Sequence, residues 1–181
     1  MSINHFTKTL SIYDFKHCYS VAAICLEFCK YLNLNQKEIH SNYIAGLYHD
    51  IGKSYIDISI LNKPDKLTSE EFDVIKKHPI YSYKICKSMN VDDHICDIIL
   101  NHHELYNGSG YPYGVSSDNI PFGARILTIC DNFDAIISDR IYREGLSFEK
   151  TLTIMENESY KFDKVLLAKF FKFIKKQNIL F

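Results

Sequence analysis

Apolar residues recur every three or four positions along most of this chain, which is the spacing of one face of an α-helix. Between residues 13 and 32, for example, the residues on one side are Val21, Ile24, Cys25 and Phe28. Strand-like alternation, in which every second residue is apolar, is scarce. The sequence therefore predicts an all-α fold with no sheet.

About seven helices are expected, and capping and breaking residues set their ends. Thr68 and Glu71 in TSEE form a capping box, in which each side chain can accept a hydrogen bond from the other residue's backbone N–H. Pro79 interrupts the helix that follows, and His78 is expected to leave ideal helix geometry because it precedes a proline. The expected helices cover residues 13–32, 36–50, 68–89, 92–103, 124–140, 147–156 and a last one that begins at 163.

Composition narrows the class of protein. The chain has 181 residues, 46% hydrophobic and 24% charged, which suits one domain of ordinary size with a real core. A net charge of -1 argues against duplex nucleic acid as a partner, since such proteins carry basic surfaces. No apolar run approaches the roughly 18 residues that cross a bilayer, so no membrane insertion is expected. The N-terminus also lacks the apolar stretch of a secretory signal.

Six cysteines are present and none forms a CxxC pair. Cys25 and Cys29 lie one helical turn apart beside apolar residues, which favours small, reduced core side chains. Together with the missing signal, this predicts a cytoplasmic protein.

Several histidines and aspartates are candidates for metal binding. They are His49 and Asp50 in HDIGK, His102 and His103 at the end of another helix, and Asp131 within an apolar helix. Each has an ordinary alternative: a helical histidine is usually hydrogen-bonded or exposed, and Asp131 could pair with Arg125 or Arg140. His with Asp suits Fe, Mn or Zn, and the lack of cysteine ligands argues against a structural thiolate zinc site.

The motifs, taken in order, resemble the HD-GYP family, a branch of the HD-domain phosphohydrolases. HD alone is a weak motif, but the full ordered set with an intact Gly110-Tyr111-Pro112 is specific, and the resemblance runs from about residue 13 to 173. It implies a single domain over residues 1–181, with a helical core of about five helices, additional C-terminal helices and no separate sensor or receiver domain. The matching segments are HCYSVA, GLYHDIGK, KPDKLTSEEFDVIKKHP, HHELYNGSGYPYG, IPFGARILTICDNFDAIISDRIYR and YKFDKVLLAKF.

The resemblance implies a site for two transition-metal ions. His17, His49, Asp50 and Asp131 match the ligands of one ion, and His78, His102 and His103 match those of the second, with Asp50 bridging. Some members carry a glutamate for a third ion where this chain has Tyr13, so two ions are expected. Fe or Mn is expected first, with Zn, Ni or Co as alternatives. Two octahedral ions would keep about two positions for phosphate oxygens, as a catalytic site requires.

The family's reaction is hydrolysis of cyclic di-GMP to linear pGpG, and often onward to GMP. Asp50 and Lys53 match catalytic positions, and Lys53, Tyr111, Arg140 and Arg143 match substrate contacts. The ordinary alternatives are a solvated lysine at a helix end, a tyrosine that fills its own loop, and arginines that pair with Glu144 or Asp139. Asp134 could orient a ligand or pair with Arg125.

Other readings of function stay open. The chain could be an HD-type phosphohydrolase for another cyclic dinucleotide, such as a hybrid one, or a protein that binds the dinucleotide or a partner without turnover. Leu105, Tyr106 and Asn107 depart from the family's usual loop, which puts substrate fit in doubt. The apolar C-terminal segment favours core packing, while Leu180 and Phe181 could join a homodimer or a regulatory partner.

Overall fold

The computed structural model describes residues 12–139 and 144–177, and within these ranges it contains nine α-helices, three 3-10 helices and no strand. The prediction of an all-α fold is confirmed. The α-helices are α1 (Ile12–Tyr31), α2 (Gln36–Tyr48), α3 (Ile58–Leu61), α4 (Ser69–Ile75), α5 (His78–Ser88), α6 (Asp93–Leu100), α7 (Phe122–Ile137), α8 (Phe148–Asn157) and α9 (Lys164–Gln177). The 3-10 helices are η2 (Ile51–Tyr55), η3 (Ser117–Asn119) and η4 (Ser159–Lys161).

The expected helix over residues 68–89 is wrong in one respect, because it is two helices, α4 and α5. Thr68 and Glu71 form the predicted capping box at the start of α4. The break falls at Lys76 and Lys77, and His78 begins α5 instead of being displaced from it. Pro79 lies in the first turn of α5, where a missing backbone N–H costs no helical hydrogen bond.

Two other helix ends also differ from expectation. The helix predicted over residues 92–103 ends at Leu100, so both histidines of the HH pair lie in the turn that follows. The helix predicted to reach Arg140 ends at Ile137. A four-residue helix, α3, forms in the connector after η2 and was not expected.

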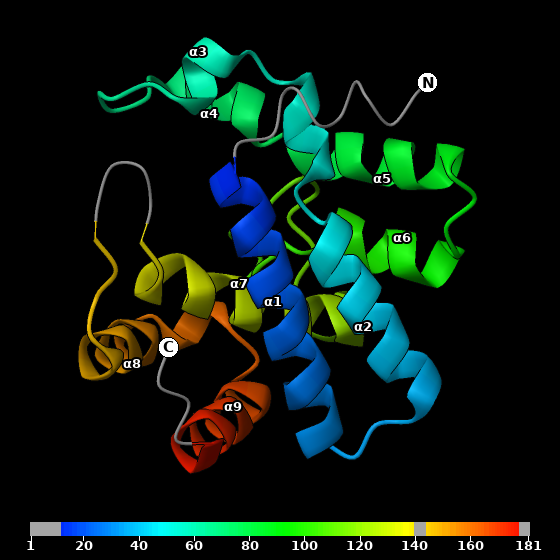
Figure 1. The fold of residues 1–181 in the computed structure, drawn as a ribbon, viewed down its shortest axis with the longest axis vertical. Helices are drawn as coiled ribbons and strands as arrows, with labels where there is room; N and C mark the ends of the chain where they lie inside the picture. The colour runs from blue at the N-terminus through cyan, green and yellow to red at the C-terminus, as the bar shows by residue number, and fades with distance from the viewer. Residues whose placement is uncertain (1–11, 140–143, 178–181) are drawn as a thin grey trace.

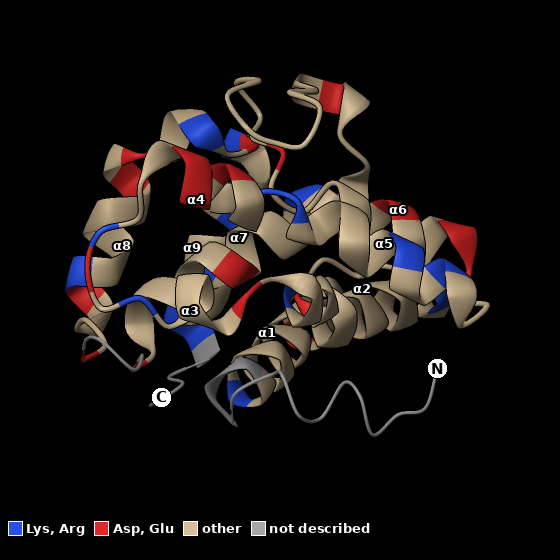
Figure 2. Ribbon diagram, turned by 90° about the horizontal axis from the view of Figure 1, so that it is seen from above, with Lys and Arg blue, Asp and Glu red and all other residues tan. Residues whose placement is uncertain are grey.

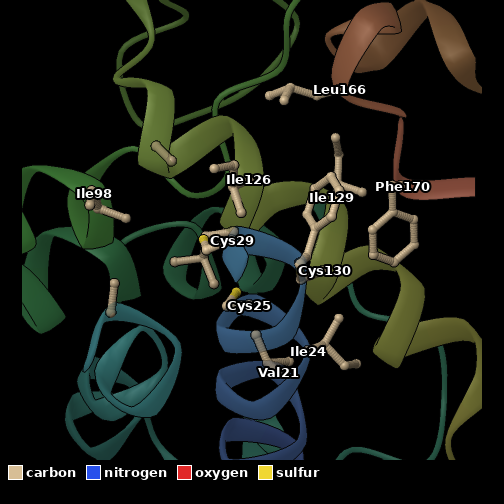
Figure 3. Close-up of a cluster of buried hydrophobic side chains, with 14 of the residues drawn as sticks. Val21, Ile24, Cys25, Cys29, Ile98, Ile126, Ile129, Cys130, Leu166 and Phe170 are labelled. Atoms are coloured by element: carbon tan, nitrogen blue, oxygen red, sulfur yellow. The ribbon is translucent and has the colours of Figure 1, made fainter. Parts of the chain in front are cut away.

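The core forms where α1, α6, α7 and α9 meet, as Figure 3 shows for Val21, Ile98, Ile129 and Phe170. Phe28 on α1 packs edge-on against Phe170 on α9, with ring centroids 5.1 Å apart. The predicted core role of the C-terminal segment is confirmed for its buried residues Phe170, Phe173 and Ile174. Leu180 and Phe181 lie outside the described residues.

Helices α1 and α2 lie side by side through the middle of the molecule (Figure 1). A Cβ atom at Gly46 on α2 would lie 2.7 Å from Cα of Ala22 on α1, so only glycine permits this approach. The close contact matters for function because it brings His17 on α1 next to His49 at the end of α2.

All six cysteines are free and buried, as predicted. Basic and acidic residues are both spread over the described part of the molecule (Figure 2), consistent with the near-zero net charge. Among the described helices, none combines the length and the apolar character needed to span a membrane.

Candidate metal centre

Five separate parts of the chain bring histidine and aspartate side chains together. His17 comes from α1, His49 and Asp50 from the end of α2, His78 from the start of α5, His102 and His103 from the turn after α6, and Asp131 from α7. Two sets have ligand atoms that all lie within 4.8 Å of one another: His17 with His49 and Asp50, and His78 with His102 and His103. The sequence-predicted ligands are thus gathered in one place.

Asp50 lies between the histidines of the first set and those of the second set. Its two carboxylate oxygens face different histidines. Oδ1 is 3.2 Å from Nε2 of His78, while Oδ2 is 3.4 Å from Nε2 of His49 and 3.8 Å from Nε2 of His17. Burial raises the pKa of a carboxyl group, but Lys53 and the surrounding histidines together hold the pKa of Asp50 well below its usual value. Asp50 is therefore an ionised group between two sets of imidazoles.

Among the described residues, the ion-pair partners of Asp131 are histidines. Its Oδ1 lies 2.9 Å from Nε2 of His17 and 3.7 Å from Nε2 of His49. Arg125 instead binds Asp118 and Asp163. The alternative in which Arg125 pairs with Asp131 or Asp134 is therefore wrong, and Arg140 lies outside the described residues.

Three of the histidines are oriented by backbone carbonyls three residues earlier in the chain. The Nδ1 atom of His49 donates to the carbonyl of Gly46 at 2.8 Å, and His78 and His102 make the same bond to Ile75 and Ile99 at 2.8 and 2.6 Å. This tautomer leaves each Nε2 without a proton and able to bind a cation. Burial also lowers the pKa of His78 to about 3 and that of His103 to about 4, so both are neutral at pH 7.

His17 is oriented by a carboxylate instead. Its Nδ1 donates to Oδ2 of Asp134 at 2.5 Å, and Asp134 also accepts hydrogen bonds from Ser20 and Ser138. Burial lowers the pKa of His17, but the hydrogen bonds to Asp131 and Asp134 outweigh burial and raise it to about 9. Of the two roles considered for Asp134, the structure supports the one in which it orients a ligand.

His102 and His103 follow the end of α6 and lie close together. The ring centroids of His102 and His103 are 4.1 Å apart, and His78 lies 5.3 and 4.9 Å from them. The following loop folds back so that Tyr111 lies against His103, with ring centroids 4.7 Å apart.

Gly110 makes this fold-back possible. A Cβ atom there would lie 2.4 Å from the carbonyl oxygen of His103 and 2.6 Å from Cα of Glu104. Tyr111 then donates its backbone N–H to the carbonyl of His103 at 3.1 Å. The glycine of the GYP motif is needed for close backbone approach, which is the reason Tyr111 lies beside the histidines.

The proposed ligands fit metal ions because two of their buried polar atoms have no hydrogen-bond partner among the described residues. These are Nε2 of His49 and Oδ1 of Asp50, which point toward the other candidate ligands. An unpaired buried polar atom is costly, and a cation between these atoms removes that cost. The set of neutral imidazoles and ionised carboxylates suits transition metals such as Fe, Mn or Zn.

One side of the site is partly open to solvent. The side chains of His17 and Lys53 are 13% and 19% exposed, and His103 and Tyr111 are half-buried, whereas the other ligands are buried. Lys53 donates to Oδ2 of Asp50 at 2.6 Å. Of the predicted substrate contacts, Lys53 and Tyr111 are thus beside the site, and Arg140 and Arg143 lie outside the described residues.

Three buried or half-buried hydroxyl residues that support the site were missed from the sequence. Ser20 binds Asp134, Thr128 donates to the carbonyl of His102 at 2.7 Å, and Ser82 donates to the carbonyl of His49 at 2.6 Å. Ser82 also accepts from the backbone N–H of Gly52 at 2.8 Å. Each hydroxyl is three or four residues from a proposed ligand on the same helix, and this spacing was the signal that could have found them.

A family model described as the HD domain matches residues 2–166. The chain belongs to the HD-domain family. Its intact Gly110-Tyr111-Pro112 and its curated relatives place it in the HD-GYP branch.

Two curated relatives illustrate this membership. "Cyclic di-GMP phosphodiesterase PA4108" of Pseudomonas aeruginosa is 34% identical over 166 residues, which cover 91% of this chain and 40% of the relative. "3'3'-cGAMP-specific phosphodiesterase 1" of Vibrio cholerae is 36% identical over 148 residues, covering 82% of this chain and 34% of the relative. The HD-GYP chain thus spans less than half the length of these relatives.

A solved structure shares the fold. Bd1817 of Bdellovibrio bacteriovorus, described as a HDG"Y"P protein, aligns with a TM-score of 0.73 at 20% identity, covering 93% of this chain and 55% of that one. At this identity the likeness shows the fold alone.

The unusual loop of this HD-GYP domain leaves the histidines in place. Asn107 is exposed, and its side chain accepts hydrogen bonds from the backbone and hydroxyl of Ser109. Tyr106 donates its backbone N–H to the carbonyl of Lys161 at 2.8 Å. The departures from the family pattern are accommodated by local turn bonds and by contact with η4, while Tyr111 stays against His103.

Proposed function

We propose that this HD-GYP domain is a binuclear-metal phosphodiesterase that hydrolyses cyclic di-GMP to linear pGpG, with GMP as a further product. The observation that carries the proposal is the position of Asp50, whose two oxygens face two separate sets of histidines. A carboxylate in this position suits a bridge between two cations. The names of the relatives in Pseudomonas and Vibrio support the substrate class.

The proposed ligands are those expected from the resemblance. His17, His49 and Asp131 would hold one ion, His78, His102 and His103 the other, and Asp50 both. Fe or Mn is proposed first, with Zn, Ni or Co as alternatives. Two such ions supply the positive charge that activates water and stabilises the developing charge of a phosphodiester in hydrolysis.

The chain's own groups would position the substrate. Lys53 lies on the partly open side of the site, where it donates to Asp50. It would contact a phosphate oxygen once the Asp50 carboxylate binds the metal ions. Tyr111 lies against His103 and would limit where the phosphodiester can enter. Arg140 and Arg143 are proposed to hold the second phosphate, because an arginine fork can bind phosphate in two places.

A second candidate substrate is a hybrid cyclic dinucleotide, which the name of the Vibrio relative favours. A third reading is a protein that binds a cyclic dinucleotide without turnover. All seven proposed ligands are present, which supports the enzyme over this last reading.

The deciding experiment incubates metal-loaded protein with cyclic di-GMP, 3'3'-cGAMP and cyclic di-AMP, with chromatography of linear and mononucleotide products. Cleavage of cyclic di-GMP at the highest kcat/KM is expected. Preference for 3'3'-cGAMP would move the assignment to the second candidate. Binding without cleavage in a preparation that holds about two metals per chain would favour the third.

Arg140→Ala tests the proposed contact between Arg140 and the second phosphate of the substrate. It should leave metal content intact and reduce kcat/KM on cyclic di-GMP by about ten- to a hundredfold, the scale of one charge-assisted hydrogen bond. Bis(p-nitrophenyl) phosphate needs only the metal centre, so its hydrolysis should change far less. Equal loss on both substrates would mean that Arg140 supports the metal centre instead.

We also propose that residues 1–181 act as one domain in the cytoplasm, which the six free, buried cysteines support. A homodimer or a regulatory protein is the proposed macromolecular partner. Light scattering of the purified chain would test for the dimer.

A further inference from the structure

Phe72 on α4 is a large apolar side chain that the core does not use. It is 44% exposed, and none of the residues of α4 is buried. The helix is held instead by its capping box and by the ion pair of Lys63 with Glu71 at 2.7 Å. Together α3 and α4 lie at one end of the molecule, beyond the bundle of longer helices (Figure 1).

The position of Phe72 distinguishes it from other exposed aromatic residues. Its ring lies edge-on to that of Tyr111, with centroids 6.5 Å apart. Tyr111 in turn lies 4.7 Å from His103 and 6.4 Å from His78. Phe72 is therefore separated from the second set of proposed ligands by a single aromatic side chain.

The substrate class proposed above carries flat purine bases next to its phosphates. With one phosphodiester at the metal centre, its base must lie against side chains that surround the partly open side. One face of Tyr111 is already taken by the His103 ring, at an interplanar angle of 32°. Phe72 lies at the next position outward and is 44% exposed, with the Lys76 ammonium over its ring at 4.8 Å from the centroid. Bases stack on aromatic side chains with little regard to sequence, because every base has a π face.

We propose that Phe72 stacks against one purine base of the bound cyclic dinucleotide, so that α4 forms part of the substrate site. This inference rests on the proposed function. It assigns a substrate contact to a side chain that is neither a metal ligand nor a neighbour of one in sequence. Phe72 would then act on substrate affinity and leave the chemistry at the metals unchanged.

Phe122 provides a matched control. It is also an exposed phenylalanine, at 40%, and it also has a cation over its ring, Arg125 at 5.4 Å, as Phe72 has Lys76 at 4.8 Å. Phe122 begins α7, nine residues before Asp131, which corresponds to about 13 Å along a helix. Neither phenylalanine is buried, so both alanine variants should fold.

The test measures kcat and KM of the metal-loaded wild type, Phe72→Ala, Phe72→Trp and Phe122→Ala. The substrates are cyclic di-GMP and methyl p-nitrophenyl phosphate, a diester without a base. Phe72→Ala should raise KM for cyclic di-GMP by about five- to a hundredfold, the range measured for one stacked base, with kcat nearly unchanged. Phe72→Trp should retain wild-type KM, and Phe122→Ala should behave as wild type on both substrates.

Two results would overturn the stacking role. One is a KM for cyclic di-GMP that is the same in Phe72→Ala and Phe122→Ala. The other is an equal loss on the base-free diester, which would show that α4 supports the metal centre. If the wild type cleaves no cyclic dinucleotide, the proposed function fails. Equilibrium dialysis of the wild type and Phe72→Ala with cyclic di-GMP then tests the stacking role of Phe72 separately. Binding that Phe72→Ala weakens would retain the stacking role, and unchanged or absent binding would reject it.

Discussion

His17 on α1 donates from Nδ1 to Oδ2 of Asp134 on α7 over 2.5 Å, and this bond joins residues 117 positions apart in the chain. The other histidines with a described Nδ1 partner bind backbone carbonyls, which carry no net charge. A carboxylate partner makes the opposite ring nitrogen a stronger base and a stronger metal ligand. His17 should therefore depend on one specific side chain for its ligand strength.

Asp134→Asn should weaken metal binding at the His17 set by about ten- to a hundredfold, since the amide keeps the geometry but loses the charge. Titration of the metal-free protein with Mn²⁺ measures this without reliance on turnover. Asp139→Asn, another aspartate near the end of α7 but an exposed one, is the control and should bind as wild type. Wild-type affinity in Asp134→Asn would show that the bond to His17 does not tune the ligand.

The metal-free protein should be most stable near pH 6.5. Burial holds the pKa of His78 at about 3 and of His103 at about 4, so the unfolded chain binds more protons as the pH falls below about 6.5, and stability drops. The pKa of His17 is raised to about 9, so its stabilising contribution is complete below about pH 6.5 and is lost as the pH rises through 9. That contribution is on the order of 3 kcal/mol.

Urea denaturation of metal-free protein between about pH 4.5 and 8.5 checks both sides of this optimum. The upper limit matters because buried thiols such as Cys86, whose pKa burial raises to about 12, add their own loss of stability above about pH 9. His17→Asn should remove the decline between pH 7 and 8.5 and leave the acid decline in place. An unchanged alkaline decline in that variant would assign it to another group.

Asp50→Ala should lose both metals and all turnover, because it removes a carboxylate whose two oxygens face both histidine sets. Elemental analysis and chromatography of products measure the two losses. Asp97→Ala, which changes an exposed aspartate on α6, should keep both. Retention of two metals at the wild-type rate by Asp50→Ala would exclude a bridging role.

Gly110→Ala should displace Tyr111 and reduce turnover at least about tenfold, at a cost in stability of about 1–3 kcal/mol, since its Cβ would overlap the backbone of His103 and Glu104. Gly114→Ala is the matched control in the same loop. It has φ of +69° and meets nothing closer than 3.5 Å, so it should cost only about 1–2 kcal/mol of left-handed strain. Equal turnover in the two variants would remove the special role of Gly110.

The ligand set could be predicted because its members are chemically unusual where they occur. An aspartate among Ile129, Cys130 and Phe133 requires a partner, and paired histidines beside a glycine-rich loop have few ordinary uses. The partner of Asp131 could not be chosen from the sequence, since arginines and histidines satisfy a carboxylate equally well in a one-dimensional pattern. Tertiary packing decided for His17, because α1, which carries His17, packs against α7, which carries Asp131.

The helix ends were harder to predict than the helices themselves. The break at Lys76 and Lys77 has no glycine or proline at the break itself, and Pro79 was assigned the disruption because it is the stronger local signal. In the structure Pro79 instead starts a helix, a position that proline tolerates well. The supporting hydroxyls were missed because their spacing of three or four residues from a proposed ligand was not used as a signal. Spacing alone also does not give their partners, which are the Asp134 side chain for Ser20 and the carbonyls of His49 and His102 for Ser82 and Thr128.

Gly52 meets the backbone of α5 so closely that a Cβ there would lie 2.2 Å from the carbonyl oxygen of His78 and 2.4 Å from the amide nitrogen of Ser82. The backbone of the turn that follows Asp50 thus packs directly against the backbone of α5, the helix that carries His78. Side chains adapt by rotating about their bonds, whereas a contact between two backbones has little freedom to adjust. The spacing between the backbones that carry Asp50 and His78 would then be a fixed property of the scaffold. A change of metal ion would have to be accommodated by the side chains of the proposed ligands, because the backbone segments that carry them are held in contact.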